Sequence, residues 1–432
     1  MKDEKRVSRR DFMRGAAAAG AAVGGFTILG ATAKGAGKVF KVGLVGCGGR
    51  GSGALSQHVR AAKVLREKAN LDVDVQVVAT ADYFEGRARG TGKKHGVPPE
   101  RCFAGPTAYQ KLLDQDLDIM LTAAPPVFRP VHFAAAIEAG KHVFMEKPVA
   151  VDAPGVRQVI EAGKQAKEKG LLVVAGTQRR HQPNYNRRAQ EIQEGAYGRV
   201  MGARVAWNMG RIFHNNPMHP SKPEDLVQRG NWQLWIEMSG DHICEQHVHN
   251  IDIANWYIGT HPDNAGGFGH RHRRKAGNMY DFFSIDFEYK VDGRSVYCHS
   301  MCRQIGGCWN WVGEQFTFEQ GKPGDFKLSE PVRYSEIPQV RGGHSQEHVN
   351  FLYYLVKGQY LNEARDVAWA TGAAIMGRDA AYSGRRMRWV EMYEDPKKNP
   401  KIYNKQLQPT AKDFETGQID YPEDGDYPIP GK

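Results

Sequence analysis

The hydrophobic pattern in the first half of the chain alternates between short apolar runs and longer amphipathic stretches. Apolar runs of strand length lie at residues 39–45, 73–79, 118–123, 142–145 and 171–176. Segments with helical spacing of apolar positions lie at residues 52–69, 132–139 and 154–169. Strands that alternate with helices in short units are typical of parallel pairing with right-handed crossovers. The pattern therefore predicts an α/β fold with a doubly wound parallel sheet.

Beyond about residue 180, apolar and polar positions alternate with a period of two. This alternation is found at residues 199–209, 280–289, 295–301 and 315–318. It predicts long, mostly antiparallel strands in a large sheet with one face open. Helices are expected at residues 244–257, 346–357 and 364–382. Because an uncovered apolar sheet face usually finds a partner, we expect this second α/β unit to support a homo-oligomer.

The N-terminus has the features of an export signal. Arg9 and Arg10 stand in SRRDFMR, an Ala- and Gly-rich apolar run follows over 15–29, and Ala-Thr-Ala at 31–33 offers a cleavage site. This order predicts a twin-arginine (Tat) signal peptide, export through the Tat machinery, and a periplasmic or otherwise exported protein. An ordinary Sec signal or an uncleaved anchor is the alternative. No later apolar run has the length of a membrane span, so we expect no stable membrane anchor.

Composition narrows the class of protein only slightly. A chain of 432 residues with 41% hydrophobic and 25% charged residues has the balance of a globular protein with two domains. The net charge of +11 is scattered, apart from HRHRRK at residues 270–275, which we interpret as solvated surface. No nucleic-acid-binding motif accompanies the charge, so no nucleic-acid partner is expected. Six Cys residues without a CxxC pair predict buried thiols rather than a disulfide scaffold.

A glycine fingerprint follows the first predicted strand. In KVGLVGCGGRG, the G-x-G-x-x-G motif is formed by Gly46, Gly48 and Gly51, and Arg50 lies within it. Gly46 permits a tight turn, Gly48 lets the backbone approach a pyrophosphate, and Gly51 lets helix and strand pack closely. The helix N-terminus then offers N–H groups to phosphate. The alternative is a purely structural glycine turn, but the strand–turn–helix setting favours a dinucleotide site of Rossmann type.

Asp82 ends the second predicted strand, in VVATAD. A carboxylate there binds ribose hydroxyls and repels a 2′-phosphate, which favours NAD over NADP. Arg87 and Arg89 follow closely and weaken this preference. A role for Asp82 as a helix N-cap is compatible with ribose binding.

The stretch AAPPVFRPVHFAAAIEAGKHVFMEKPVA at 123–150, with GTQRRHQPNY at 176–185, carries a family resemblance. These segments resemble the glucose–fructose oxidoreductase, inositol dehydrogenase and MocA-like (Gfo/Idh/MocA) family, with Glu146-Lys147-Pro148 as the most specific element. The resemblance extends from about residue 38 to residue 389. It implies an NAD-binding Rossmann domain at 38–178 and a substrate-binding and oligomerisation domain at 179–393. We expect residues 1–33 to be the signal peptide and residues 394–432 to form an irregular C-terminal tail.

The resemblance also implies roles for individual residues. Lys147 is expected to reach the substrate hydroxyl that becomes a carbonyl. Pro148 is expected to bend the chain, and a cis peptide bond is one way in which it can do so. The expected cofactor contacts beyond the glycine motif and Asp82 are Pro125, His132, Glu146, Lys147, Gln178 and Arg180. The expected substrate contacts are Arg179, His181, Tyr185, Arg211 and Trp232.

A second catalytic element is expected in SGDHICEQHVHNIDIANW, residues 239–256. The family commonly shows an Asp and, four residues later, a His on a helix. Here Glu245 stands at the Asp position and His249 at the His position, and this spacing puts both on one helix face. His249 is the expected general base, and Glu245 is expected to orient or polarise it or to bind sugar hydroxyls. As an alternative, a divalent metal ion could be bound by His242, Glu245, His247 and His249. We prefer the interpretation in which this helix binds no metal.

Several further residues are weaker candidates. His214 and His219 accompany Arg211 in a possible substrate loop, RIFHNNPMHP. Trp235, like Trp232, would suit stacking on a sugar ring or a place in the core. His344 precedes a predicted helix.

Three functions remain open from the sequence. The first is oxidation of a sugar, glycoside or cyclitol by hydride transfer from a ring carbon to NAD. The second is an NAD-dependent glycosidase that works by oxidation, elimination and hydration with cofactor recycling. The third is a sugar-binding protein without catalysis. Because an exported enzyme has little free NAD around it, we expect the NAD to be tightly bound. The intact glycine motif, Lys147 and His249 favour the first function.

Overall fold

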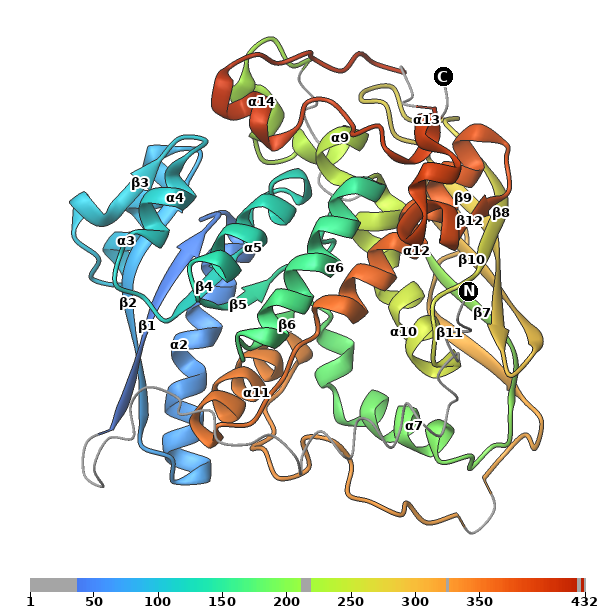
Figure 1. The fold of residues 1–432 in the computed structure, drawn as a ribbon, viewed down its shortest axis with the longest axis horizontal. Coiled ribbons are helices and arrows are strands. Elements are labelled where there is room, and N and C mark those ends of the chain that lie inside the picture. Colours follow the sequence, from blue (N-terminus) through green and yellow to red (C-terminus); the bar gives the residue numbers. More distant parts are fainter. Residues whose placement is uncertain (1–36, 211–218, 324–325, 426–428, 431–432) are drawn as a thin grey trace.

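A computed structural model describes residues 37–210, 219–323, 326–425 and 429–430. It contains two six-stranded sheets, which lie at opposite sides of the view in Figure 1 with helices between and around them. The predicted signal peptide at 1–33 lies outside the described residues, as do Arg211 and His214 of the expected substrate loop. None of the helices within the described ranges combines the length and the apolar character that a membrane span requires.

The first sheet is wholly parallel, with the strand order β3-β2-β1-β4-β5-β6. Its strands are β1 Lys38–Val45, β2 Val73–Asp82, β3 Cys102–Ala104, β4 Ile119–Thr122, β5 His142–Met145 and β6 Val173–Ala175. Its crossover segments are α2 Gly49–Ala69, α3 Glu85–Lys94, η1 Pro99–Arg101, α4 Ala108–Leu113, η2 Pro126–Phe128, α5 Arg129–Glu138 and α6 Ala153–Glu168. This order is that of the dinucleotide-binding doubly wound fold, whose ligand crevice opens where β1 and β4 diverge. The predicted sheet is confirmed. The short elements α3, β3 and α4 were not predicted.

The second sheet has the order β11-β7-β10-β9-β8-β12. Its strands are β7 Val200–Met209, β8 Asn264–His270, β9 Phe282–Val291, β10 Arg294–Gln304, β11 Trp311–Phe318 and β12 Met387–Arg388. Only β7 and β10 pair in parallel, so the predicted mostly antiparallel sheet is confirmed. One face packs on helices, and the register puts the exposed Phe268 and Tyr297 on the other. The homo-oligomer stays a prediction.

The segments around this sheet include several short turns. They are η3 Gln178–His181, α7 Pro183–Gln193, α8 Pro223–Val227, η4 Trp232–Leu234, α9 Ile236–Ser239, η5 Ile243–His247, α10 Val248–Ile258, α11 Gly343–Lys357 and α12 Ala364–Ser383. The helix α12 packs against both α6 and α10, and so it joins the two sheets.

The helix α11 does not stay with the domain that precedes it in sequence. It packs against α2, and the two helices lie side by side in Figure 1. Apolar side chains of α11 such as Phe351 and Leu352 share a core with Phe40 and Leu44 of β1. The boundary expected at 178/179 is therefore incomplete, because residues 343–357 return to cover one face of the first sheet.

The C-terminal residues run back over the molecule to the first sheet. They form η6 Val390–Glu394, η7 Pro396–Lys398, α13 Pro400–Tyr403 and α14 Ala411–Thr416. In α14, which lies at the top of Figure 1, Phe414 packs against Phe128 with ring centroids 4.9 Å apart. Leu407 N–H donates to Asp152 Oδ2 at 2.9 Å. The tail wraps the surface as expected, but it is more regular than predicted, because a Thr410–Asp413 capping box starts α14.

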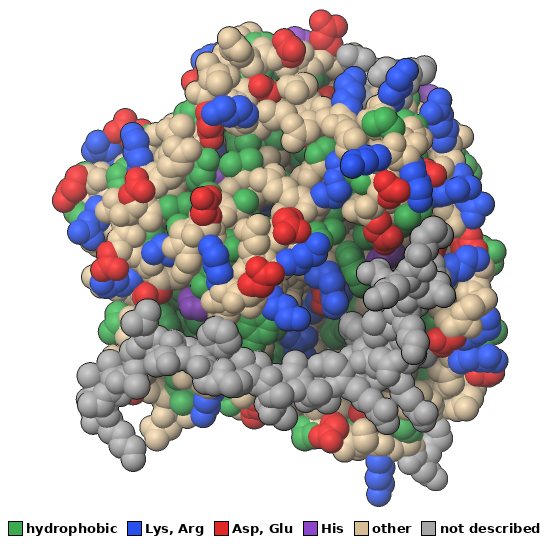
Figure 2. Space-filling model, viewed as in Figure 1, with side chains coloured by type: hydrophobic (Ala, Val, Ile, Leu, Met, Phe, Trp, Pro, Cys, Tyr) green, Lys and Arg blue, Asp and Glu red, His purple; other side chains and the backbone are tan. Residues whose placement is uncertain are grey.

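Charged side chains are distributed much as the sequence suggested. On the face drawn in Figure 2, Lys and Arg are interspersed with Asp and Glu. All six Cys residues are free, and only Cys308 is exposed.

Candidate functional site

The turn after β1 is built around its glycines. Gly46 has φ +89°, and a Cβ there would lie 2.5 Å from Ala124 N. A Cβ on Gly51 would lie 1.8 Å from the Gly46 carbonyl oxygen, so helix and strand tolerate no side chain at this point. A Cβ on Gly48 would meet no protein atom within 4 Å. The predicted steric roles of Gly46 and Gly51 are confirmed, and the space at Gly48 is where the fingerprint requires room for a pyrophosphate.

A cavity of about 720 Å³ opens at this turn. It lies outside the carboxyl ends of β1, β2 and β4, the location expected for a ligand in an open α/β sheet. Its walls include the glycine turn with Arg50, and the second domain contributes Trp232 and Glu245. The first domain adds Asp82, Arg87, Pro125, Phe128 and His132. Burial lowers the pKa of His132 to about 3, so its ring is neutral.

Asp82 is the last residue of β2 and lines the cavity. Cys47 N–H donates to its Oδ2 at 2.6 Å and Phe84 N–H donates to its Oδ1 at 2.9 Å. Phe84 itself is the N-cap of α3, so Asp82 supports the start of that helix without being its cap residue. Arg87 lines the same cavity and lies over the Phe84 ring at 4.4 Å, whereas Arg89 forms an ion pair with Glu85 at 2.7 Å. Of the two arginines that weaken the NAD preference, only Arg87 faces the site.

Lys147 meets the second domain at Glu245, which lines the cavity. The Lys147–Pro148 peptide is cis. The side chain is 13% exposed, and its Nζ donates to the Glu245 carbonyl oxygen at 2.5 Å and lies 3.5 Å from Glu245 Oε1. Lys147 and Glu245 therefore pair across the domains, a contact that the sequence did not predict. The helix predicted to carry Glu245 begins with a π-helical turn, η5, before α10.

His249 lies in the first turn of α10 and is 5% exposed. Its ring stacks on Trp207 with centroids 5.9 Å apart. Burial holds its pKa well below the usual value, and the positive charges of Lys147 and Arg179 add to this effect. The imidazole is therefore neutral at ordinary pH, which is the form a general base needs.

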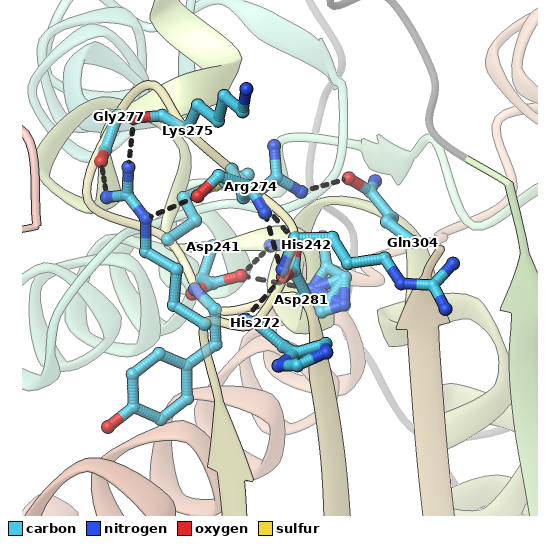
Figure 3. A network of polar contacts seen from close by, with 12 residues as sticks. Asp241, His242, His272, Arg274, Lys275, Gly277, Asp281 and Gln304 are labelled. Atoms are coloured by element: carbon cyan, nitrogen blue, oxygen red, sulfur yellow. Dashed lines mark hydrogen bonds and ion pairs between the residues drawn. The ribbon is translucent and has the colours of Figure 1, made fainter. Parts of the chain in front are cut away.

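The basic segment 270–275 is connected by hydrogen bonds to η5, the turn that carries Glu245. Figure 3 shows Arg274 and Asp281 at the centre of a polar network that reaches Asp241 and His242. Arg274 is only 4% exposed, and its Nη2 donates to Gln304 Oε1 at 2.6 Å. Gln304 in turn donates to Gln246 Oε1 at 2.9 Å, next to Glu245 in η5. The interpretation of the whole segment as solvated surface is wrong for Arg274, because Asp281, seven residues later, draws it inward.

The metal alternative gains no support from these histidines. His242 Nδ1 lies 3.0 Å from Asp241 Oδ1, and His247 Nε2 lies 2.7 Å from Ser300 Oγ, so both rings have partners away from Glu245. Within the described ranges, no three His, Cys, Asp or Glu side chains gather as metal ligands.

Glu146 and Arg50 form an ion pair beside Lys147. Arg50 Nε lies 2.6 Å from Glu146 Oε1, and Lys147 N–H donates to Glu146 Oε2 at 3.3 Å. The opposite side of the Arg50 guanidinium faces Glu347 of α11, with Nη2 3.6 Å from Oε1. Glu347 was not expected at the site. Glu347 belongs to the helix expected at residues 346–357, which the sequence analysis assigned to the second domain.

The stretch 178–181 divides between the site and the core. Arg179 forms an ion pair with Glu314, whose carboxylate also accepts hydrogen bonds from Tyr185 Oη at 3.2 Å and Asn250 Nδ2 at 2.7 Å. The Arg179 guanidinium lies over the Trp207 ring at 5.8 Å, and Trp207 stacks on His249, so this group lies close to His249. Glu314 lies in an alternating strand, and nothing in the sequence singled it out. The Gln178 carbonyl packs on Gly343 of α11.

Arg180 and His181 do not reach the cavity. The Arg180 guanidinium is buried against Asp252, with Nε and Nη2 2.8–2.9 Å from its oxygens, and lies 3.1 Å from Asp366. His181 is buried with Nε2 3.3 Å from Glu363 Oε2 and Nδ1 2.9 Å from Asn350 Nδ2. We expected Arg180 to contact the cofactor and His181 to contact the substrate. In the structure both side chains instead pair with buried carboxylates. Trp235 is likewise a core residue, whereas Trp232 faces the cavity.

Comparison with known proteins agrees with a dinucleotide-binding first domain. Residues 40–177 match the family model GFO_IDH_MocA, described as an oxidoreductase family with an NAD-binding Rossmann fold. The chain is 27% identical over 237 residues to an inositol 2-dehydrogenase of Acidothermus cellulolyticus, and this match covers 55% of the chain and 59% of that protein. It is 30% identical over 219 residues to an inositol 2-dehydrogenase of Paracoccus denitrificans, over 51% and 54% of the two chains. The chain thus spans somewhat more than half the length of these relatives.

Solved structures share the whole two-domain fold. A levoglucosan dehydrogenase in complex with NADH and levoglucosan superposes with a TM-score of 0.64 at 15% identity, covering 81% of this chain and 99% of that one. A probable dehydrogenase from Thermotoga maritima superposes with a TM-score of 0.55 at 18% identity and the same coverage. Identities this low establish the fold alone. Residues 40–177 match the NAD-binding Rossmann domain of the Gfo/Idh/MocA oxidoreductase family, and the glycine turn described above lies within them.

Proposed function

We propose that the protein oxidises a ring hydroxyl of a sugar, glycoside or cyclitol by transferring hydride from the ring carbon to NAD. The observation that carries this proposal is the meeting of Lys147, Glu245 and the neutral His249 beside a cavity that begins at a dinucleotide-binding turn. Both relatives named above are inositol dehydrogenases, and a structural neighbour binds an anhydrosugar, which supports a polyhydroxylated ring as the substrate.

The cavity fits the dinucleotide. The open space at Gly48 leaves room for its phosphates, and the N-terminus of α2 and Arg50 supply N–H donors and positive charge there. Asp82 would hold the adenosine ribose, while Pro125 and His132 would line the path to the reacting end. NAD, when bound, supplies the hydride acceptor.

The residues of this chain manage the proton. Lys147 Nζ is held by Glu245, and an ammonium in that position stabilises the developing alkoxide of the substrate. His249, kept neutral by burial and by nearby positive charge, accepts the hydroxyl proton. Arg179, Glu314 and Tyr185 form a polar group suited to bind further ring hydroxyls, and Trp232 offers an aromatic face.

A panel of cyclitols, free sugars and glycosides tests this proposal. We expect reduction of NAD, followed by near-ultraviolet absorbance, together with a keto product found by mass spectrometry. Release of the aglycone with an unoxidised sugar would instead indicate the NAD-dependent glycosidase, which no observation on the described residues favours. Binding of sugars without either product would indicate a sugar-binding protein.

Tight binding of NAD is a separate part of the proposal. The tail crosses beside the cavity, where Phe414 packs on Phe128 and Tyr83, and Glu415 Oε1 accepts a hydrogen bond from Tyr109 Oη at 3.1 Å. Because Tyr83, Tyr109 and Phe128 line the cavity, this cover should slow dissociation. We expect denaturation of the purified protein to release stoichiometric NAD or NADH, identified by mass spectrometry. Release of NADP would contradict the reading of Asp82 and assign the 2′-phosphate to Arg87.

Export through the twin-arginine route remains our proposal for localisation, on the strength of Arg9, Arg10 and the apolar run that follows them. A fusion of residues 1–37 to a reporter protein should be exported, and replacing both arginines with lysine should stop this. Export that survives the replacement would favour the Sec route.

A further inference from the structure

We propose that the basic segment 270–275 and the loop after it are the docking site for the acidic end of the C-terminal tail, and that this contact closes residues 407–425 as a strap over the dinucleotide cavity. Nucleotide enters and leaves when the strap lifts at this end. The inference rests on the proposed binding of NAD and deepens it, because it names the contact that regulates exchange of the cofactor.

The inner end of the strap is held by groups of the first domain. Leu407 N–H donates to Oδ2 of Asp152, a residue that is only 8% exposed. Just before it, the Arg157 guanidinium of α6 donates to the Tyr403 carbonyl oxygen at 3.1–3.2 Å and to Asn404 Oδ1 at 3.0 Å. Hydrogen bonds to charged groups are about twice as strong as neutral ones. The tail is therefore fixed at this end.

The middle of the strap lies on side chains that enclose the nucleotide cavity. The Phe414 ring packs on Phe128 and on Tyr83, with ring centroids 4.9 Å and 6.1 Å apart. Tyr109 Oη donates to Glu415 Oε1 at 3.1 Å. Because Tyr83, Tyr109 and Phe128 also line the cavity, they can swing outward only when α14, at the top of Figure 1, lifts away from them.

The outer end of the strap is held by the loop that follows the basic segment. Gly277 N–H donates to Asp424 Oδ1 at 2.5 Å, and Gly425 N–H donates to the Gly277 carbonyl oxygen at 3.1 Å. The same carbonyl accepts a hydrogen bond from Arg271 Nη1, which also lies 3.7 Å from the position that a Cβ on Gly425 would take. Gly277 and Lys275 lie together at one edge of the network in Figure 3. The acidic end of the tail therefore meets the basic segment here.

Exposure makes this outer contact the one that opens. Glu423 and Asp424 are exposed on the tail, and Arg273 and Lys275 are exposed on the basic segment. Opposite charges at an exposed contact attract only weakly, and salt screens the attraction. The inner end depends instead on the buried Asp152, so the strap lifts from its outer end. The basic segment thereby gains a role beyond that of solvated surface.

Exchange of the bound nucleotide in the full-length protein tests the strap. The protein is mixed with excess isotope-labelled NAD and separated from free nucleotide at intervals, and the labelled fraction released by denaturation is measured by mass spectrometry. We expect Asp424→Ala to exchange on the order of tenfold faster, because it loses a hydrogen bond to a charged group. The matched control is Asp395→Ala, which removes an exposed carboxylate that pairs with Lys398 before the strap begins. It should exchange as the unchanged protein does. Equal exchange in Asp424→Ala and the unchanged protein overturns the inference.

Salt should act on the same contact. Raising the salt concentration from about 0.01 M to about 1 M shortens the Debye length from about 30 Å to about 3 Å, so exchange in the unchanged protein should become faster. Asp424→Ala, which lacks the carboxylate, should gain less. An equal gain in the two proteins overturns docking by charge.

A further measurement needs neither substrate nor bound nucleotide. Amide hydrogen exchange over residues 411–416 should be faster in Asp424→Ala than in Asp395→Ala, because the docked strap protects α14. Equal protection in the two variants overturns the inference. If the variants differ as expected while the protein oxidises no polyol, the proposed function has failed rather than the strap.

Discussion

Replacing Lys147 with Met should lower turnover by roughly a hundredfold or more, with the NAD content of the protein unchanged. Met keeps the length and apolar stem of the side chain but lacks the ammonium, which contacts Glu245 and stabilises the substrate oxygen as its proton leaves. The loss should fall on kcat rather than KM, because the interaction strengthens as negative charge develops on that oxygen. The residues proposed to hold the cofactor, including Gly48, Asp82 and Arg50, are untouched.

Steady-state kinetics on the best substrate of the panel, together with nucleotide analysis of the denatured variant, measures this effect. Lys164→Met is the matched control, since Lys164 forms only an exposed pair with Glu161 on α6. Such surface pairs contribute little, so its kinetics should equal those of the unchanged protein. Near-normal turnover in Lys147→Met would remove Lys147 from the reaction.

Replacing His249 with Gln should also cost on the order of a hundredfold in turnover, and it should remove the acid limb of the pH profile. In the unchanged protein, the rate falls as pH falls through the pKa of His249, because the protonated ring cannot accept the hydroxyl proton. That pKa lies well below the usual value, since the ring is buried and faces the positive charges of Lys147 and Arg179. Activity should therefore persist at pH values where an ordinary histidine is already protonated.

The same reasoning predicts in which direction the pKa of His249 changes when Lys147 is replaced. Removing the charge in Lys147→Met takes away one of the causes that lower the pKa of His249, so the acid limb of this slow variant should move to higher pH. Lys164→Met should leave the limb in place. An acid limb that stays where it is in Lys147→Met, or one that survives in His249→Gln, would mean that another group is the base.

The glycine turn could be predicted because its requirements are local, whereas the Glu146-Lys147-Pro148 segment was predicted from its resemblance to the family. Within the strand–turn–helix unit itself, Gly46 is required by its positive φ and Gly51 by its contact with the Gly46 carbonyl oxygen. In contrast, Glu314 and Glu347 reach the site from 135 and 297 residues beyond Arg179 and Arg50, respectively, through strand register and helix packing. No local pattern distinguishes them from other polar positions on a strand or a helix.

Neighbouring residues in η3 were assigned together and then separated by the structure. A 3₁₀ turn rotates by about a third of a circle per residue, so consecutive side chains face different surroundings. Arg179 consequently meets Glu314 at the site, while Arg180 meets Asp252 in the core. Sequence resemblance placed the stretch 178–181 near the cleft but did not show which of its side chains faces the cleft.

The return of α11 to the first sheet bears on how the chain matures during synthesis. The strands and helices of the nucleotide-binding sheet end near residue 178, yet one face of the sheet is covered only in part, by α2, until Phe351 and Leu352 arrive. At ribosomal rates of about 5–20 residues per second, the roughly 180 residues in between take on the order of 10 to 40 s. During that interval the apolar face formed by β1 and α2 is exposed to other chains and to chaperones. The dinucleotide crevice should therefore acquire its final shape only late in synthesis, after most of the second domain has emerged.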